Sequence, residues 1–174
     1  MGRPFRGALY AGLMLTEAGP KVLEFNARSG DPETQVILPR LEGSLAQLLL
    51  AAAKGELTAV VESRGGLEWD ERACACVIMA SPGYPGKYSK GVPLAGLEHA
   101  ERAGRTPDAD PSGEVIVFHA GTARQNGGYV TAGGRVLGIT AMGENIAEAR
   151  KKAYSEAEKI FFEGMQYRKD IGIK

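Results

Sequence analysis

The residues best suited to chemistry lie in one short alternating run, Glu24-Phe25-Asn26-Ala27-Arg28. Successive side chains of a β-strand point to opposite faces, so Glu24, Asn26 and Arg28 are predicted to share one face. Carboxylate and amide oxygens suit Mg²⁺, which keeps several waters and takes phosphate oxygens as further ligands. A guanidinium one pleat further on can form paired hydrogen bonds with a phosphate or an acyl phosphate. The same alternation is typical of the polar face of an edge strand, so both interpretations stay open.

Asp31 follows this run and is predicted to open a short helix. Aspartate is a favoured N-cap and Pro32 suits the first helical position, so a helix is expected from residue 32 toward residue 38, with Pro39 ending or kinking it. The free N–H groups at a helix start favour anions, and the Asp31 carboxylate could hold an amine or a hydroxyl group. Capping alone is the commoner use of such an aspartate.

The elements that must position these residues are predicted from periodicity and turn chemistry. Strands over residues 8–15 and 21–28 should pair as a hairpin through a turn that contains glycine and proline. Ser44 and Gln47 form a capping box that opens a helix, which Gly55 should end. The other elements expected are the body of that helix at Leu45–Lys54, strands over 58–61, Ala73–Ala80, Val115–His119, Gly128–Thr131 and 135–141, hairpin turns at Asn126-Gly127 and Gly133-Gly134, and an exposed loop over 101–113.

The last helix has the strongest signal in the sequence. Asn145 is its predicted N-cap, with Glu148 three residues on. Apolar residues recur at spacings of three and four from Ile146 to Phe161, and Gly164 is expected to end the helix. This helix should pack with the continuous apolar strand predicted earlier in the chain to form one core.

Composition excludes several classes of protein. The chain has 174 residues, 44% of them hydrophobic and 24% charged, which suits one ordinary globular domain or two small ones. Lys plus Arg and Asp plus Glu both number 21, so no basic excess suggests nucleic-acid binding. No apolar run approaches the roughly 18 residues of a membrane span, and no signal-peptide pattern opens the chain.

The cysteines and histidines are predicted to be structural. Cys74 and Cys76 fall on one face of an apolar strand, where buried, inert thiols are the ordinary interpretation. A reducing cytoplasm is the expected compartment. His119 has no ligand-type residues close to it in sequence and is predicted to be a hydrogen-bonded structural residue, while His99 is expected at the surface.

Several separated motifs together resemble the glycinamide ribonucleotide synthetase family, also called phosphoribosylamine–glycine ligases, of the ATP-grasp superfamily. The resemblance covers essentially the whole chain in order. It rests on Glu24-Phe25-Asn26-Ala27-Arg28, Gly30-Asp31-Pro32-Glu33-Thr34-Gln35, Ser81-Pro82-Gly83-Tyr84-Pro85-Gly86, Val117-Phe118-His119-Ala120-Gly121-Thr122, Gly134-Arg135-Val136-Leu137-Gly138 and Tyr167-Arg168-Lys169-Asp170-Ile171-Gly172. It implies ATP-dependent joining of glycine to phosphoribosylamine in purine biosynthesis, through an acyl phosphate of glycine.

The resemblance also implies roles for the residues of the first run. Glu24 and Asn26 would be ligands of Mg²⁺ (or Mn²⁺) bound with ATP. Arg28 would act catalytically beside the transferring phosphate or the substrate carboxylate. Asp31 would also be catalytic, and Asp31 and Glu33 would line the side that takes glycine and phosphoribosylamine. Two positions elsewhere in the chain, Arg135 and Lys90, are candidate ribose-phosphate contacts, although solvated turn residues are the commoner case.

An α+β fold is implied, with residues 1–56 as the end of an ATP-grasp lobe. Residues 57–174 would then form a β-rich, barrel-sandwich-type C-terminal domain with a terminal helix. The chain departs from the family in having Ser29 where a phenylalanine is usual, and in being less than half as long. We therefore expect the isolated chain to be inactive. The alternatives are a stand-alone binding protein descended from the ligase, and a half-enzyme that associates with a separate N-terminal chain or with itself.

Overall fold

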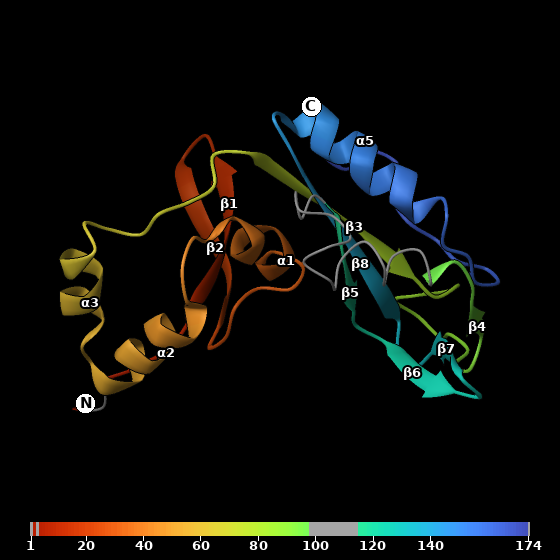
Figure 1. Ribbon diagram of the computed structural model, residues 1–174, viewed down its shortest axis with the longest axis horizontal. Helices are drawn as coiled ribbons and strands as arrows, with labels where there is room; N and C mark the ends of the chain where they lie inside the picture. The colour runs from red at the N-terminus through yellow and green to blue at the C-terminus, as the bar shows by residue number, and fades with distance from the viewer. Residues whose placement is uncertain (1, 3, 98–114, 174) are drawn as a thin grey trace. The chain divides into compact units, whose positions relative to one another are not determined.

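A computed structural model describes residues 2, 4–97 and 115–173 of the chain (Figure 1). The chain forms two compact units, Met1–Asp70 and Glu71–Lys174. Both combine helices with antiparallel strands, as the predicted α+β class requires, and no sheet among the described strands closes into a barrel. The loop expected at 101–113 and His99 lie outside the described residues. No helix in the described part of the chain is long and apolar enough to cross a membrane.

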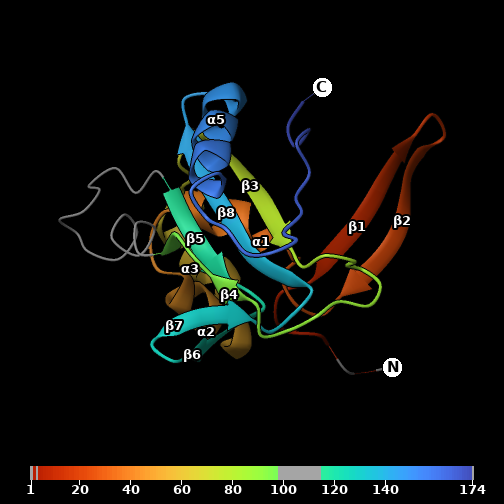
Figure 2. The same cartoon turned by 90° about the vertical axis from the view of Figure 1, so that its right-hand side faces the viewer.

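The first unit opens with the predicted hairpin, formed by β1 (Tyr10–Thr16) and β2 (Gly19–Asn26) (Figure 2). Gly19 has a φ of +90°, which a glycine adopts without steric cost where the turn enters β2. The second strand ends at Asn26, two residues earlier than predicted. Arg28 therefore lies beyond the strand, and the expectation that it continues the same pleated face is wrong.

A bulge in this hairpin lies beside the candidate metal ligand Glu24. Gly12 pairs with Glu24, but the next residue of β1, Leu13, pairs with Val22. Leu23 is thus the extra residue of β2. Bulges increase the local twist and redirect side chains, so this irregularity sets the direction in which the end of β2 presents its residues.

The segment after the hairpin forms the short helix α1 (Thr34–Ile37), continued by the 3₁₀ helix η1 (Leu38–Arg40). The prediction that Asp31 caps this helix is wrong, because its N-cap is Glu33 and no side chain caps it. Pro39 lies in the first turn of η1, a position that proline tolerates. The α-helix has already ended at Ile37, just before it.

The prediction for the next helix is confirmed to the residue. α2 spans Leu45–Lys54, the Ser44 side chain accepts a hydrogen bond from the Gln47 N–H at 3.4 Å, and Gly55 ends the helix with a φ of 78°. Its local signals therefore agree with its tertiary setting.

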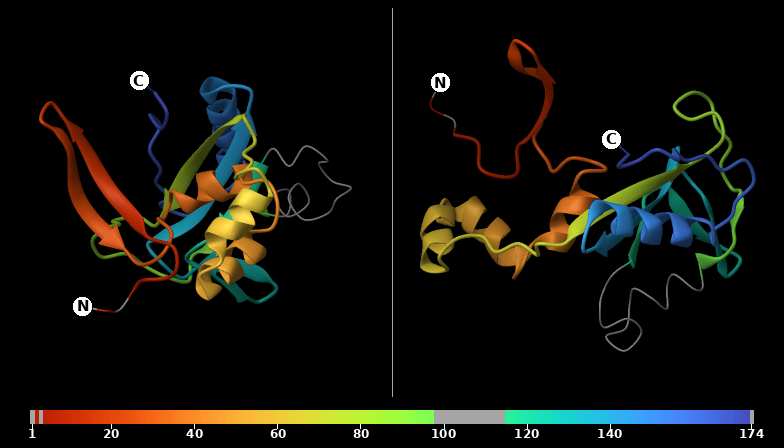
Figure 3. Two further views of the ribbon diagram at one scale, coloured as in Figure 1. Left: turned by 90° about the vertical axis from the view of Figure 1, so that its left-hand side faces the viewer. Right: turned by 90° about the horizontal axis from the view of Figure 1, so that it is seen from above.

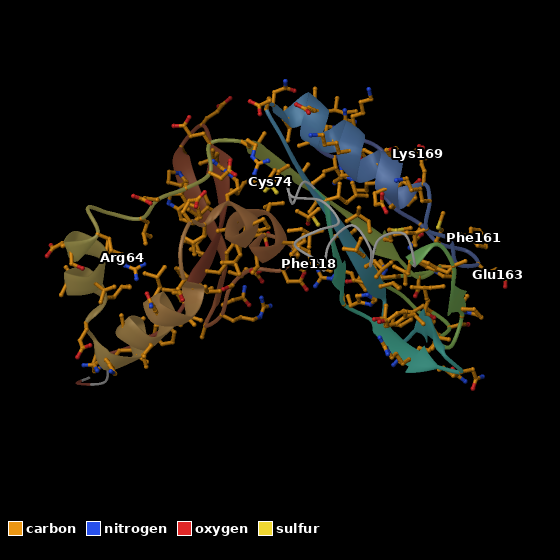
Figure 4. The ribbon with its side chains drawn as sticks, in the orientation of Figure 1. Arg64, Cys74, Phe118, Phe161, Glu163 and Lys169 are labelled. Carbon is orange, nitrogen blue, oxygen red and sulfur yellow. The ribbon has the colours of Figure 1, made fainter. Side chains whose placement is uncertain are left out.

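The strand expected at residues 58–61 is wrong, because this segment lies in the helix α3 (Leu57–Ser63) (Figure 3). Leu57 and the two valines at 60 and 61 are spaced as one face of a helix, and this spacing prevails over the β-preference of valine. Arg64, which follows α3, donates a hydrogen bond to the Gln47 side chain of α2 (Figure 4).

The second unit contains two three-stranded antiparallel sheets, in the orders β3-β8-β5 and β4-β7-β6. Their elements, with the helix that follows them, are β3 (Ala73–Ala80), β4 (Pro93–Leu94), β5 (Val115–His119), β6 (Thr122–Gln125), β7 (Gly128–Thr131), β8 (Arg135–Gly143) and α5 (Ile146–Ala157). The predicted strands are confirmed, and β4 and β6 are additions. The turn at Asn126-Gly127 does form a hairpin, with both residues at positive φ. Gly133-Gly134 does not, because β7 and β8 belong to different sheets.

The core of this unit lies between α5 and the sheet β3-β8-β5, as predicted (Figure 1). Val77, Ile139 and Ala153 are fully buried there. Cys74, labelled in Figure 4, and Cys76 alternate along β3 with the residues that face α5. Both are only half-buried, so the expectation of buried thiols is wrong. The reason is their position on the sheet face opposite α5.

The start of α5 matches its sequence signals. The Asn145 side chain accepts a hydrogen bond from the Glu148 N–H at 3.0 Å, and the Glu148 carboxylate accepts one from the Glu144 N–H at 3.0 Å. Lys152 forms an ion pair with Glu148 at 2.8 Å. The bond to Lys152 first, and then the one to Glu144, lower the pKa of Glu148 below its usual range.

The end of α5 was predicted too late. The helix stops at Ala157, so Ile160 and Phe161 do not belong to it. Ile160 is fully buried, whereas Phe161 is 59% exposed and its backbone pairs with Ala95. The apolar spacing continues past the helix because the following extended segment also packs on the core.

Gly121 should tolerate no side chain. A Cβ atom there would lie 2.4 Å from the Arg135 carbonyl oxygen and 2.6 Å from the Gly133 Cα, both backbone atoms that cannot move aside. We expect Gly121→Ala to lower the free energy of unfolding by about 1–3 kcal/mol, measured by urea denaturation. Gly128→Ala is the matched control, since its Cβ would meet nothing closer than 3.9 Å. Equal stability of the two variants would contradict this packing.

Candidate functional site

The candidate site is built on one face of the β1–β2 hairpin. The Asn26 side-chain amide donates a hydrogen bond to the Glu24 carboxylate at 3.0 Å, so the two side chains lie together as the alternation predicts. Across the ladder, Glu24 pairs with Gly12 and Asn26 pairs with Tyr10. Four residues from two strands therefore share this face.

Gly12 makes room for the Glu24 side chain. A Cβ atom at position 12 would lie 3.1 Å from the Glu24 Cγ and 3.7 Å from the Tyr10 ring. Because position 12 has no side chain, the carboxylate of Glu24 can lie over β1 beside the tyrosine. The absence of a side chain is thus a feature of the site, and the sequence pattern of β2 does not reveal it.

Tyr10 is the residue that sequence reasoning missed. Its hydroxyl donates a hydrogen bond to the Glu33 carboxylate at 2.9 Å and so connects β1 to the segment before α1. The hydrogen bond to Glu33 is the main cause that raises the pKa of Tyr10, followed by partial burial and by the negative charges of Glu33 and Glu24. In the sequence, Tyr10 alternates with Gly12. Only the structure shows that these two residues pair with Asn26 and Glu24 across the hairpin.

Asp31 and Gln35 lie in the same segment. The Gln35 amide donates a hydrogen bond to the Asp31 carboxylate at 2.9 Å, and Asp31 is exposed. The Gln35 side-chain oxygen is buried and has no hydrogen-bond partner among the described residues. Arg28 donates a hydrogen bond to the Ser29 carbonyl oxygen at 2.8 Å, which directs its guanidinium back along its own chain.

Two of the predicted contacts belong to the other unit. Arg135 is the first residue of β8 and is half-buried, and Lys90 is exposed before β4. His119 fits its structural prediction, since its Nδ1 lies 2.8 Å from the Thr122 hydroxyl and its ring packs against Tyr129 at 4.7 Å.

The donor set suits a hard cation that keeps other ligands. No group of three or more His, Cys, Asp or Glu side chains that could enclose a metal occurs in the described part of the chain. Glu24 and Asn26 each carry a side-chain oxygen that can bind a metal, and the hydrogen bond from the Asn26 amide N–H to the Glu24 carboxylate shows that the two side chains lie together. Mg²⁺ prefers oxygen ligands and keeps several waters, so the Glu24 carboxylate and the Asn26 carbonyl oxygen could supply two of its positions and leave the rest to water and phosphate.

A hollow of about 210 Å³ lies beside this face. Ser29 and Tyr10 line it together with mainly apolar neighbours from the chain before β1 and from α1 and η1. Ser29, the departure from the family pattern noted in the sequence, is therefore at the wall of an apolar space that an aromatic side chain would fill.

Comparison with known proteins decides the family. Residues 74–174, more than half of the chain, match the family model "Phosphoribosylglycinamide synthetase, C domain", and residues 1–34 match the ATP-grasp (A) domain of the same enzyme. The chain belongs to the phosphoribosylglycinamide synthetase family. The expected resemblance is thereby confirmed, and the A-domain match contains Glu24, Asn26 and Ser29.

The curated relatives that match are named phosphoribosylamine–glycine ligase. The protein from Caldanaerobacter subterraneus subsp. tengcongensis is 50% identical over 98% of this chain, and that from Rhodopirellula baltica is 50% identical over 99%. A crystal structure of the ligase from Thermotoga maritima is 38% identical over 93% of this chain, with a TM-score of 0.67. The chain spans about 37% of the length of the curated relatives it matches.

Filling the hollow should stabilise the first unit. We expect Ser29→Phe to raise the free energy of unfolding by about 1–2 kcal/mol, because its ring would bury apolar surface against the side chains that line the space. Ser29→Ala is the control, which removes the hydroxyl without filling the space and should change stability by less than about 0.5 kcal/mol. Thermal unfolding followed by circular dichroism measures both. A destabilised Ser29→Phe variant would show that the hollow does not accept the ring.

Proposed function

We propose that this chain carries the metal-binding end of the ATP site of a phosphoribosylamine–glycine ligase, followed by the C domain of that enzyme. The observation that carries the proposal is the hydrogen-bonded pair of Glu24 and Asn26 on one face of β2, inside the segment that matches the ATP-grasp domain. The complete enzyme would join glycine to phosphoribosylamine with cleavage of ATP.

Glu24 and Asn26 would hold Mg²⁺ or Mn²⁺ together with ATP. Such an ion, when bound, neutralises charge on the phosphates during phosphoryl transfer. The protein's own contribution is to keep two oxygen-bearing side chains together on one face. Gly12 supports this arrangement, because a side chain at position 12 would crowd the side chain of Glu24.

The neighbouring polar residues would serve the other substrates. Arg28 would lie by the transferring phosphate or a substrate carboxylate, where a guanidinium can bind two oxygens at once. Asp31 and Glu33 would line the side that takes glycine and phosphoribosylamine, and Asp31 would take part in catalysis. Arg135 and Lys90 would contact the ribose phosphate.

The proposal assigns residues 1–56 to the end of the ATP-grasp lobe and 57–174 to the C-terminal domain, with a barrel-sandwich-type arrangement of its two sheets. A cytoplasmic location is proposed because the chain has only two cysteines, too few to suggest a disulfide scaffold. Neither nucleic acid nor membrane is proposed as a partner. Small-molecule substrates alone are assigned to the site.

The isolated chain is proposed to be inactive and to work with a separate or preceding polypeptide. The support is the first unit's surface, where large apolar side chains of the hairpin face solvent. The most exposed of these are Leu15 at 83%, Leu23 at 64% and Phe25 at 63%. Such surface favours association, either with the missing part of a ligase or with a second copy of this chain. A stand-alone binding protein is the second candidate, favoured by Ser29 and the hollow beside it.

The deciding experiment measures ADP release with ATP, Mg²⁺, glycine and freshly made phosphoribosylamine. We expect no turnover by the chain alone, because the site is open to water and lacks the groups that would orient the nucleotide. Turnover should appear when a separate polypeptide supplies the part of the Caldanaerobacter relative that lies outside the matched region. Glu24→Ala should then reduce turnover at least about 100-fold.

The matched control is Glu17→Ala, which removes an exposed carboxylate from the turn of the same hairpin. It should leave turnover unchanged. Glu24-dependent turnover by the chain alone would show that it is a complete catalyst. No turnover with any added polypeptide, in spite of a stable complex, would favour the stand-alone binding protein.

A further inference from the structure

We propose that Tyr10 is a positioning residue of the candidate site, which holds the Glu33 carboxylate and thereby fixes the segment 29–33 against the strand that carries Glu24 and Asn26. The proposal rests on the proposed function for its catalytic meaning, although the contact itself is independent of any ligand. Tyr10 would act through Glu33 and would touch neither metal nor substrate.

The first observation is where the two ends of the contact come from. Tyr10 begins β1 and is the cross-strand neighbour of Asn26, so its ring starts from the face that carries the metal-ligand pair. Its hydroxyl reaches the Glu33 carboxylate at 2.9 Å, twenty-three residues further along the chain. A hydrogen bond to a charged acceptor is stronger than a neutral one, so this bond is well suited to hold a segment in place.

The second observation is the packing at Gly30, which lies between the two side chains. Gly30 is buried, and a Cβ atom there would lie 2.5 Å from the second oxygen of Glu33 and 3.0 Å from the Tyr10 ring. The tyrosine ring therefore rests directly on the backbone of the segment. Both the ring and the hydroxyl of Tyr10 thus contact the segment that carries Asp31 and Glu33.

The third observation is that the segment has little regular structure of its own. α1 has four residues, and a helix of that length is unstable without tertiary support. Its first bonds run from the Thr34 N–H to the Gly30 carbonyl oxygen at 3.0 Å and from the Ile37 N–H to the Glu33 carbonyl oxygen at 3.0 Å. An anchor on Glu33 therefore also stabilises the start of α1.

A ligand-free experiment tests the contact. Tyr10→Phe keeps the ring and removes the hydroxyl, and amide hydrogen exchange at Thr34 and Ile37 should become roughly tenfold faster, because a hydrogen bond to a charged group is lost. Tyr88→Phe is the matched control in the other unit and should leave both rates unchanged. Unchanged rates in Tyr10→Phe would overturn the proposal.

A double-mutant cycle guards against a general loss of folding. Glu33→Ala breaks the same bond from the other side, so the double variant should exchange no faster at Thr34 than the faster single variant. Additive effects of Tyr10→Phe and Glu33→Ala would mean that the two side chains act separately, and would also overturn the proposal.

The catalytic meaning is tested in the ligase reconstituted with its complementary polypeptide. Tyr10→Phe should raise the KM for glycine or phosphoribosylamine about tenfold and leave the KM for Mg²⁺–ATP unchanged, since the hydroxyl bond holds Glu33 and not the metal pair. An equal change in all three constants would indicate a merely structural role and overturn the proposal. If the parent assembly makes no product, the proposed function fails, whereas the exchange experiment still decides whether Tyr10 holds Glu33.

Discussion

The register of the β1–β2 ladder is the constraint on which the candidate site depends. It sets Gly12 opposite Glu24 and Tyr10 opposite Asn26, with the bulge at Leu23 immediately before them. A slip of one residue would turn every side chain of one strand to the other face and place a side chain where Glu24 needs space. The candidate metal ligands and their neighbours therefore form one feature, because a single pairing pattern fixes them all.

The two units differ in how much of their stability they can supply themselves. The second unit has a core of fully buried residues between α5 and its sheet, among them Phe162, Met79 and Leu137. In the first unit the hairpin is two-stranded, and Leu13, Leu23 and Phe25 are each more than half exposed. Two-stranded hairpins are marginally stable alone. The candidate site is thus on the unit with the more exposed apolar surface, while the other unit has a buried core of its own.

Local signals predicted the fold wherever they agreed with tertiary packing, and failed where tertiary contacts decide. Ser44 and Asn145 cap their helices as the sequence indicates, and the strand Ala73–Ala80 is correct. The role of Asp31 was mistaken because the helix begins further along the chain, with Glu33 as its N-cap. Of the site, the alternation on β2 could be predicted. Tyr10 could not, because its contact with Glu33 depends on hairpin register and on the packing over Gly30.

The candidate metal ligands, Glu24 and Asn26, are open to solvent, and this limits how tightly they could hold an ion. Glu24 is exposed and Asn26 is half-buried, so an ion held by these two side chains would have most of its coordination sphere open to solvent. Mg²⁺ gives up its waters reluctantly, and two protein donors alone hold it weakly. Tighter binding of Mg²⁺ must then come from the phosphates of a nucleotide. Those phosphates must in turn be held in place by a group that covers the exposed Glu24 and Asn26. The exposed apolar side chains Leu13 and Phe25 alternate along their strands with Gly12 and Glu24, so they lie on the opposite face of the hairpin from the candidate ligands. Covering the apolar face would stabilise the first unit, whereas the site itself would become effective only when its own face is covered as well.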